Sequence, residues 1–368
     1  MTSGRQASCE AGTLGALTAG QLQRLCRVAG LEARDAEGYG QVLRESLGLV
    51  ADRPLDLPPP YRTFLSDDHT PVEYSLSFRA DAPPTLRVLL EPGCGAAGWA
   101  ENGKIGLAFV RELARRWDFD AGGLDEVEDL FFPSEPAGPL ALWCALELCS
   151  GGVPKVKVYL NPSARGADRA AETLREALER LGHRQAFASL PPGDGYPFLA
   201  MDLGAWEAPR LKVYVLHADL SATEATGLSR MHAGPTPDMV REFFATVAGF
   251  GREEGDGTRL AGLPAQSHHA FTDVDDDRPS GFTLYIPVRD YAPHDGEALA
   301  RGVALCRQHG IDPAPLAQAL TAVTDRRLED GAGLISYLAV NHQRGSRPRV
   351  TAYISSEAYA VRPPAGGR

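Results

Sequence analysis

The chain has 368 residues, of which 43% are hydrophobic, so it is long enough for one large globular domain or two ordinary ones. Its formal net charge of −11 argues against general nucleic-acid binding, because a phosphate backbone needs a basic surface. Six scattered cysteines indicate free thiols in a reducing compartment, and neither a signal segment after Met1 nor a run of eighteen apolar residues occurs. We therefore expect a cytoplasmic protein that contacts neither nucleic acid nor a membrane.

The first sixty residues predict helices. Thr18 is expected to cap the first helix, and residues 39–49 have the apolar spacing of a second. Four prolines between positions 54 and 60 then end the helical pattern. We expect a single domain over 1–368, with a helical segment at about 1–60 and its main body at about 65–360.

Pairs of strand-like segments recur after the prolines, with helical segments between the pairs. Short connections within each pair favour antiparallel hairpins over a parallel doubly wound sheet. The expected pairs are 72–78 with 86–91, 140–148 with 153–160, 198–203 with 211–217, 267–272 with 282–288, and 334–340 with 350–355. The expected helices are 105–117, 168–181, 236–248 and 296–309.

The segment 210–215 has one apolar face and one polar face. Strict alternation places Arg210, Lys212 and Tyr214 on the polar side. The earlier segment 155–160 repeats the pattern, with Lys157 and Tyr159 at the matching positions. Two edge strands with lysines turned to water would also give this pattern.

Closing ten antiparallel strands into a barrel, with the helices outside, would remove every sheet edge. We therefore predict an α+β fold: a ten-stranded antiparallel barrel built from repeated α-β-β-α units. Its lumen would receive the polar face of each strand. That face carries Lys157, Tyr159, Arg210, Lys212, Tyr214, Thr283, Tyr285, Tyr337, Arg349, Thr351 and Tyr353, with Glu91 at the end of the second strand.

Cations that converge in a cavity repel one another unless an anion joins them, so a diphosphate or a polycarboxylate is the expected ligand. Aromatic faces attract cations, so the interleaved tyrosines suit a reaction that separates a diphosphate from a carbocation. A non-catalytic barrel that binds an anionic aromatic ligand would show a similar lumen.

Several motifs resemble those of dimethylallyltryptophan synthase-type aromatic prenyltransferases, and the chain looks like a bacterial branch of this family. The resemblance covers about residues 65–360 in the right order. The motifs are Leu90-Glu91-Pro92, Lys157-Val-Tyr159, Arg210-Leu-Lys212-Val-Tyr214, Thr283-Leu-Tyr285-Ile-Pro287, Ile335-Ser-Tyr337 and Val350-Thr-Ala-Tyr353. The resemblance implies the ten-stranded prenyltransferase barrel, a dimethylallyl diphosphate donor and tryptophan or a similar indole as acceptor.

The resemblance also implies roles for individual residues. Glu91 would accept a hydrogen bond from the indole N–H. The diphosphate would be held by Lys104, Lys157, Arg210, Lys212, Tyr285 and Arg349. The allylic cation and the substrate would be enclosed by Tyr159, Tyr214, Thr283, Tyr337 and Tyr353. We expect no cofactor, no metal site and no magnesium requirement, and a monomer or weak homodimer.

The chain also departs from the family pattern. Fungal members carry a lysine, thought to help remove the ring proton, near the strand that ends here at Leu148, where this chain has Leu148-Cys149-Ser150. Which group accepts the ring proton therefore stays open. The ring position depends on how the indole lies over the allyl cation, and the donor length depends on the depth of the pocket, so both stay open as well. Glu91 favours an indole over a phenolic acceptor only modestly.

Three other motifs are set aside. Residues 93–98 match G-x-G-x-x-G, but the sequence after Pro92 does not predict a helix, and no second parallel strand ends in an acidic residue. The acidic run 273–277 is expected in a hairpin loop, not on a helix that faces a metal. His268 and His269 should point to opposite faces of a strand, so they make a poor metal site.

Overall fold

The structure is a computed structural model that describes residues 12–138, 142–204, 206, 210–250 and 258–365. The N-terminal segment is helical and consists of α2 (Leu14–Val28), α3 (Ala33–Leu47) and the short 3₁₀ helix η1 (Gly48–Asp52). Helix α2 begins earlier than expected, because Thr13 is its N-cap and accepts a hydrogen bond from the backbone N–H of Ala16. The predicted cap Thr18 is wrong: its hydroxyl lies inside the helix and donates to the Leu14 carbonyl at 2.8 Å, a bond that threonine often makes within helices.

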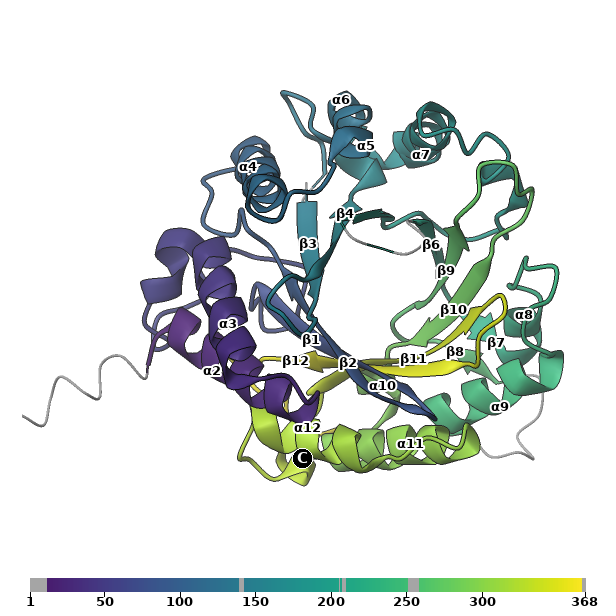
Figure 1. Cartoon of the computed structure of the whole chain (residues 1–368). Coiled ribbons are helices and arrows are strands. Elements are labelled where there is room, and N and C mark those ends of the chain that lie inside the picture. Colours follow the sequence, from purple (N-terminus) through teal and green to yellow (C-terminus); the bar gives the residue numbers. More distant parts are fainter. Residues whose placement is uncertain (1–11, 139–141, 205, 207–209, 251–257, 366–368) are drawn as a thin grey trace, which may run out of the picture.

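Ten antiparallel strands close into one barrel in the order β1-β12-β11-β10-β9-β6-β5-β4-β3-β2, and β2 pairs again with β1 (Figure 1). The fold predicted from the sequence is confirmed. The strands are β1 (Val72–Arg79), β2 (Ala82–Leu90), β3 (Leu142–Glu147), β4 (Lys155–Leu160), β5 (Leu199–Leu203), β6 (Leu211–His217), β9 (Ala265–Phe271), β10 (Gly281–Ile286), β11 (Ile335–Gln343) and β12 (Arg349–Ser355). Residues 140 and 141 of the predicted segment 140–148 lie outside the described residues. Strands β7 (Leu220–Ser221) and β8 (Arg259–Leu260) form a separate two-stranded sheet.

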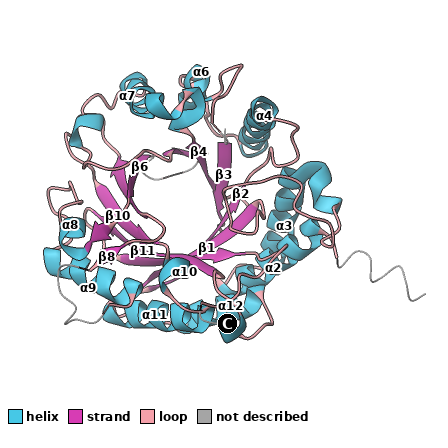
Figure 2. Cartoon of the chain, turned by 180° about the vertical axis from the view of Figure 1, so that it is seen from behind, coloured by secondary structure: helices cyan, strands magenta, loops and turns pink. Residues whose placement is uncertain are grey.

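Helices surround the barrel on its outer side, and a short one that carries Arg289 lies at one end of it (Figures 1 and 2). They are α4 (Trp99–Trp117), α5 (Gly122–Asp125), α6 (Glu128–Phe131), α7 (Ala170–Arg180), α8 (Ala222–Thr226), α9 (Pro237–Ala248), α10 (Val288–Tyr291), α11 (Asp295–Gln308) and α12 (Ala314–Val323), with short 3₁₀ turns η2 (Pro162–Arg165), η3 (Ala167–Arg169), η4 (Phe187–Ser189) and η5 (Leu328–Asp330). Helix α4 starts at Trp99, directly after the G-x-G-x-x-G match, so the prediction that no helix opens there is wrong. The preceding strand β2 nevertheless pairs only antiparallel with its neighbours, unlike the strand of a dinucleotide-binding unit.

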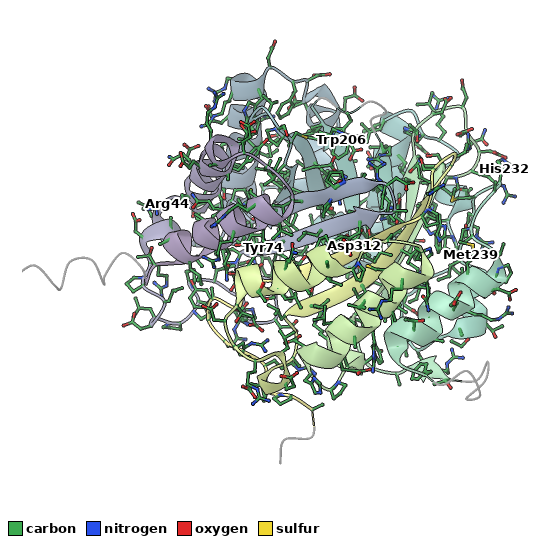
Figure 3. The ribbon with its side chains drawn as sticks, turned by 60° about the horizontal axis from the view of Figure 1, so that its bottom comes forward. Arg44, Tyr74, Trp206, His232, Met239 and Asp312 are labelled. Atoms are coloured by element: carbon green, nitrogen blue, oxygen red, sulfur yellow. The ribbon has the colours of Figure 1, made fainter. Side chains whose placement is uncertain are left out.

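The space between barrel and helices is the hydrophobic core. The outward side chains of β1 are Val72, Tyr74, Leu76 and Phe78, all of them buried. Tyr74, labelled in Figure 3, packs against α2, and its hydroxyl donates to the Thr18 carbonyl at 2.8 Å. Burying one such side chain contributes about 1.5–3 kcal/mol to the stability of the fold. Because this core lies between the barrel and the helices, the side chains inside the barrel are free to contact a ligand.

The described cysteines, Cys26, Cys94, Cys144, Cys149 and Cys306, are all free thiols, and Cys9 lies outside the described residues. Within the described part of the chain, no helix has the length and apolar character needed to cross a membrane.

Candidate active site

The inner face of the barrel divides into two parts along its axis. One pocket is lined by a cluster of aromatic side chains, among them Trp143, Tyr159, Phe198, Tyr214, Tyr285, Tyr337 and Tyr353. A second pocket continues from it into a group of basic side chains, including Arg87, Lys157, Lys212 and Arg349. We call these the aromatic pocket and the cation pocket.

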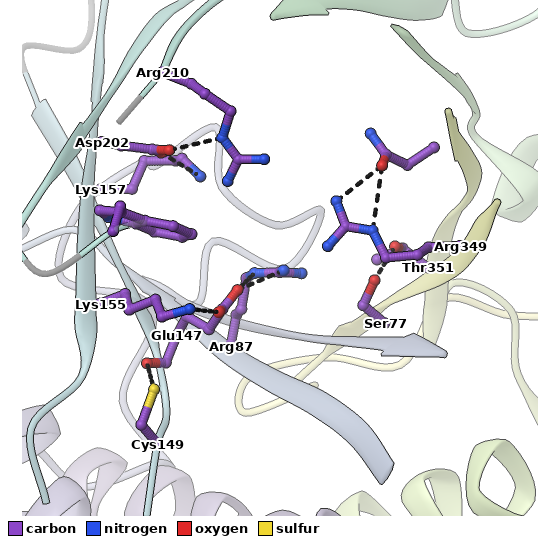
Figure 4. Close-up of polar contacts among 12 residues, drawn as sticks. Ser77, Arg87, Glu147, Cys149, Lys155, Lys157, Asp202, Arg210, Arg349 and Thr351 are labelled. Carbon is purple, nitrogen blue, oxygen red and sulfur yellow. Dashed lines mark hydrogen bonds and ion pairs between the residues drawn. The ribbon is translucent and has the colours of Figure 1, made fainter. Parts of the chain in front are cut away.

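Two buried carboxylates hold four cations in place: Lys157 and Arg87 of the cation pocket, and Arg210 and Lys155, which line a further cavity that shares Arg349 with it (Figure 4). Asp202 on β5 pairs with Lys157 at 2.8 Å and with Arg210 at 2.9 Å. Glu147 on β3 pairs with Arg87 on β2 at 2.6 Å and with Lys155 at 3.5 Å. Both carboxylates lie directly opposite a cationic partner in the strand register, since Arg87 faces Glu147 and Lys157 faces Asp202.

The carboxylates do not neutralise the cation pocket. Burial lowers the pKa of Lys212 well below its usual value, and the charges of Lys157 and Arg210 lower it further. Burial together with Arg87 and Arg210 lowers the pKa of Arg349 to about 10. A dianionic or trianionic ligand would reverse both shifts, so the pocket is electrostatically suited to a diphosphate.

A chain of hydrogen bonds joins the two pockets. Arg349 donates to Asn341 Oδ1 at 2.8 Å, and Asn341 Nδ2 donates to the Thr283 hydroxyl at 2.6 Å. Thr283 contacts His268 Nε2 at 3.1 Å, and His268 Nδ1 contacts the Tyr285 hydroxyl at 2.5 Å. Burial and the nearby lysines lower the pKa of His268 well below its usual value, so the imidazole is neutral and both ring nitrogens are occupied within the network.

The tyrosines form a continuous wall. The ring centroids of Tyr214 lie 5.9 Å from Tyr159 and 5.8 Å from Tyr285, and Tyr353 lies 5.7 Å from Tyr285 and 6.3 Å from Tyr337. Burial raises the pKa of Tyr159, Tyr214 and Tyr285 well above the usual value, so their hydroxyls stay protonated. Neutral phenol rings at these spacings can stabilise a cation through their π faces without becoming anions.

Glu91 follows β2 and is only 1% exposed. Its Oε1 accepts a hydrogen bond from Asn102 on α4 at 3.0 Å, and its Oε2 accepts from the Thr63 hydroxyl and from the indole N–H of Trp143 at 3.2 Å. Burial raises the pKa of Glu91, and these three donors offset part of that effect. A side chain at Gly93 would collide with Asn102, so a glycine after Glu91-Pro92 permits this close approach of α4.

The structure does not bring every predicted residue to the lumen. Lys104 is exposed on the outer helix α4, where it lines a groove with Trp99 and Phe131. It lies apart from the cation pocket, because α4 packs on the outside of the barrel.

Other residues of the site were missed by the sequence analysis. Arg87, Glu147, Asp202 and Asn341 line or anchor the cation pocket, and Glu73 lies at its border with the aromatic pocket. Arg87 could have been found by extending the alternation backward from Glu91 through Leu89. Asp202 and Glu147 could not have been found in this way. They lie beside Lys157 and Arg87 because of the register between neighbouring strands, which the sequence of a single strand does not show.

The acidic run and the histidine pair lie as expected. Residues 273–277 form the loop between β9 and β10, where Asp276 pairs with Arg344 and Asp277 with His232. His268 faces the lumen, while His269 packs against Phe282 on the outer side. Among the described residues, no group of three or more histidine, cysteine, aspartate or glutamate side chains is arranged to hold a metal ion.

The chain is similar to proteins of one family. A family model described as tryptophan dimethylallyltransferase matches residues 18–318. The solved structure of the prenyltransferase PriB in a ternary complex with L-tryptophan and dimethylallyl thiolodiphosphate is 59% identical, covers 96% of this chain and 99% of that chain, and has a TM-score of 0.94.

Two further solved structures are similar over nearly their whole length. 5-Dimethylallyltryptophan synthase from Streptomyces coelicolor is 61% identical, with 96% of this chain and 100% of that chain covered and a TM-score of 0.92. 6-Dimethylallyltryptophan synthase from Micromonospora olivasterospora is 36% identical, with 96% and 99% covered and a TM-score of 0.86.

Proposed function

Because the chain belongs to the tryptophan dimethylallyltransferase family, we propose that it transfers a dimethylallyl group from dimethylallyl diphosphate to an indole ring carbon of L-tryptophan. The observation that carries this proposal is the division of the lumen into a cation pocket and an aromatic pocket that open into each other. The reaction needs both parts, since an anionic leaving group must separate from a carbocation beside an aromatic acceptor.

The cation pocket would hold the diphosphate. Lys157, Arg210, Lys212 and Arg349 would contact its oxygens, and Arg87 would join them from β2. Tyr285 would add a hydroxyl at the border of the two pockets. Asp202 and Glu147 would position the cations, because they fix Lys157, Arg210 and Arg87 before the ligand arrives. Lys104 is left out of this proposal because it lies on the outer side of the barrel.

The tyrosine wall would protect the allylic cation from water. Tyr159, Tyr214, Tyr337 and Tyr353 line the aromatic pocket, and Thr283 anchors the network that fixes Tyr285. Ionisation breaks the C–O bond of the donor, the ring carbon attacks the allylic carbon, and the ring then loses a proton. The reaction needs no cofactor, and we propose that magnesium is not required because protein cations already offset the diphosphate charge.

Glu91 would accept the indole N–H of the substrate. It already accepts one indole donor, that of Trp143, which lines the aromatic pocket. An ionised carboxylate has about four acceptor positions, and among the described residues three donors occupy Glu91. Glu91 itself lines neither pocket, so its remaining position would have to turn towards the aromatic pocket beside Trp143 to reach the substrate.

The test is an incubation with dimethylallyl diphosphate and L-tryptophan, with diphosphate release followed in the presence and absence of the acceptor. Release that depends on tryptophan, together with a product of the mass of dimethylallyltryptophan, is expected. Tyrosine and a dihydroxynaphthalene serve as alternative acceptors. Preferential turnover of either would assign the enzyme to a phenolic substrate, and binding of both ligands without release would identify a non-catalytic barrel.

A further inference from the structure

The aromatic pocket and the cation pocket meet at a ring of six residues that line both: Glu73, Leu89, Tyr159, Tyr214, Tyr285 and Tyr353. If the diphosphate lies in one pocket and the indole in the other, as the proposed function requires, the new carbon–carbon bond forms at this ring of residues. The attacked carbon of the indole still carries its hydrogen when the new bond forms. A group at this border must therefore accept that proton.

Most groups at this border are poor proton acceptors. Burial raises the pKa of all four tyrosines, so they are neutral phenols. His268 has both ring nitrogens engaged, with Thr283 and Tyr285. Lys157 and Lys212 would be held protonated by the bound diphosphate. Among the six residues that line both pockets, Glu73 is the one with a carboxylate side chain.

Glu73 lies on the inner face of β1, between Leu89 of β2 and Ser355 of β12 in the strand register. Its Oε1 accepts a hydrogen bond from the Ser336 hydroxyl at 2.8 Å. Within the described residues no cation lies within ion-pair distance of it, whereas Arg289, the nearby cation, is paired with Asp67 at 2.9 Å. Among the described residues, one hydrogen-bond donor and no ion-pair partner stabilise the negative charge of Glu73, whereas three donors stabilise that of Glu91.

We propose that Glu73 accepts the proton from the prenylated ring carbon. The ring C–H bond breaks, its electron pair restores the aromatic system, and an O–H bond forms on the Glu73 carboxylate; the proton passes to water when the products leave. Burial raises the pKa of Glu73 to about 7, with the Ser336 hydroxyl and Arg289 opposing this, and a general base is most effective with a pKa near the working pH. This role would replace that of the lysine which fungal members carry near the position of Leu148.

The experiment compares the parent enzyme with Glu73→Gln, using L-tryptophan with a protiated or a deuterated indole ring. We expect the substitution to lower kcat by about 10²-fold or more, in the range of general-base contributions. It should also increase the deuterium isotope effect on kcat, because removal of the ring proton becomes rate-limiting. Glu73→Asp, which keeps a carboxylate, should recover part of the rate and of the parent isotope effect.

A second measurement uses a donor with ¹⁸O in the bridging oxygen. If the alkylated ring waits for a base, it can return its allyl group to diphosphate, so recovered donor from Glu73→Gln should show ¹⁸O scrambled into the non-bridging positions. A folded Glu73→Gln variant with a lower rate but the parent isotope effect and no scrambling would overturn the proposal, as would the parent rate. The proposed function is tested separately, because it depends only on whether the parent prenylates tryptophan.

Discussion

At the scale of single residues, Glu91 carries the prediction that most directly tests the acceptor site. As the indole attacks, positive charge develops on its nitrogen, so a carboxylate that accepts the N–H is worth more in the transition state than in the ground state. Glu91→Gln should lower kcat by ~10²–10³ and change tryptophan affinity far less. Steady-state kinetics together with equilibrium tryptophan binding measures both.

The control for Glu91 is Glu101→Gln, which removes an exposed carboxylate in the first turn of α4, outside the barrel. This variant should retain most of the rate if Glu91 acts on the substrate. A Glu91→Gln protein with a lower melting temperature but a near-parental rate would instead make Glu91 a residue that stabilises the turn before α4.

Glu73 should also affect stability in a pH-dependent way. Its pKa, raised from 4.5 to about 7, means that the folded state binds the proton more tightly than the unfolded state. The resulting stabilisation is complete below about pH 4.5 and is lost as the pH rises through 7, which amounts to at most about 3 kcal/mol. Arg289 and Asp67 are the charged groups nearby, and they act in opposite directions on this pKa.

Glu73→Gln should therefore raise the melting temperature relative to the parent at pH 8.5, and the difference should shrink towards pH 4.5. Thermal unfolding at several pH values measures this. The exposed Glu37 on α3 gives a matched control, and Glu37→Gln should show no such trend. A pH-independent difference for Glu73→Gln would mean that its carboxyl is not perturbed by burial.

The lysines of the cation pocket test the donor site. Lys157→Ala or Lys212→Ala removes a charge-assisted contact worth about 1.5–3 kcal/mol, so catalysis should fall by roughly tenfold or more in each case. Affinity for the unreactive thiolodiphosphate donor should fall with it. Lys104→Ala is the matched control, since Lys104 lies outside the barrel, and parental donor binding is expected there. Parental donor binding in both lumen variants would move the diphosphate elsewhere.

At the scale of the elements, alternation along the strands was enough to predict which side chains face the lumen. The pattern of Arg210, Lys212 and Tyr214 needs only the two-residue period of a strand. The two-residue period could not show that Asp202 lies opposite Lys157 or that Glu147 lies opposite Arg87. Which residues pair across two strands depends on how the strands are aligned in the closed sheet. Lys104 was assigned to the diphosphate by the resemblance alone, and it lies elsewhere because it belongs to α4, which packs on the outside of the barrel.

The tyrosine wall draws its side chains from β4, β6, β10, β11 and β12, and Tyr214 of β6 can be used to test whether the ring face or the hydroxyl matters. Tyr214→Phe keeps the π face that stabilises a cation, whereas Tyr214→Leu removes it. The phenylalanine variant should therefore be the milder of the two in kcat. It loses the hydroxyl contact with Tyr285, which is long at 3.4 Å. Equal damage from both substitutions would mean that the hydroxyl matters and the ring face does not.

At the scale of the whole molecule, barrel closure explains how an acidic protein maintains a cationic site. The net charge is −11, yet Arg87, Lys157, Lys212 and Arg349 line the cation pocket, and Arg210 lines the cavity beside it (Figure 4). Composition alone could not predict this concentration of charge. The recurring hairpins could predict it. Ten paired strands avoid an exposed edge by closing into a barrel, and the closed barrel turns the polar face of each strand towards the lumen.

This distribution of charge leads to a prediction about magnesium. A diphosphate leaving group needs its charge offset, and in the lumen lysine and arginine side chains can do so without a metal. The acidic run at 273–277 lies in the β9–β10 loop, and its Asp276 and Asp277 are already paired with Arg344 and His232. Turnover measured in excess EDTA should equal turnover in the untreated enzyme, while added salt should weaken donor binding by screening the cations. If activity is lost in EDTA and magnesium alone restores it, a metal ion offsets the charge of the leaving group. The acidic loop 273–277 would then be the candidate site for that ion.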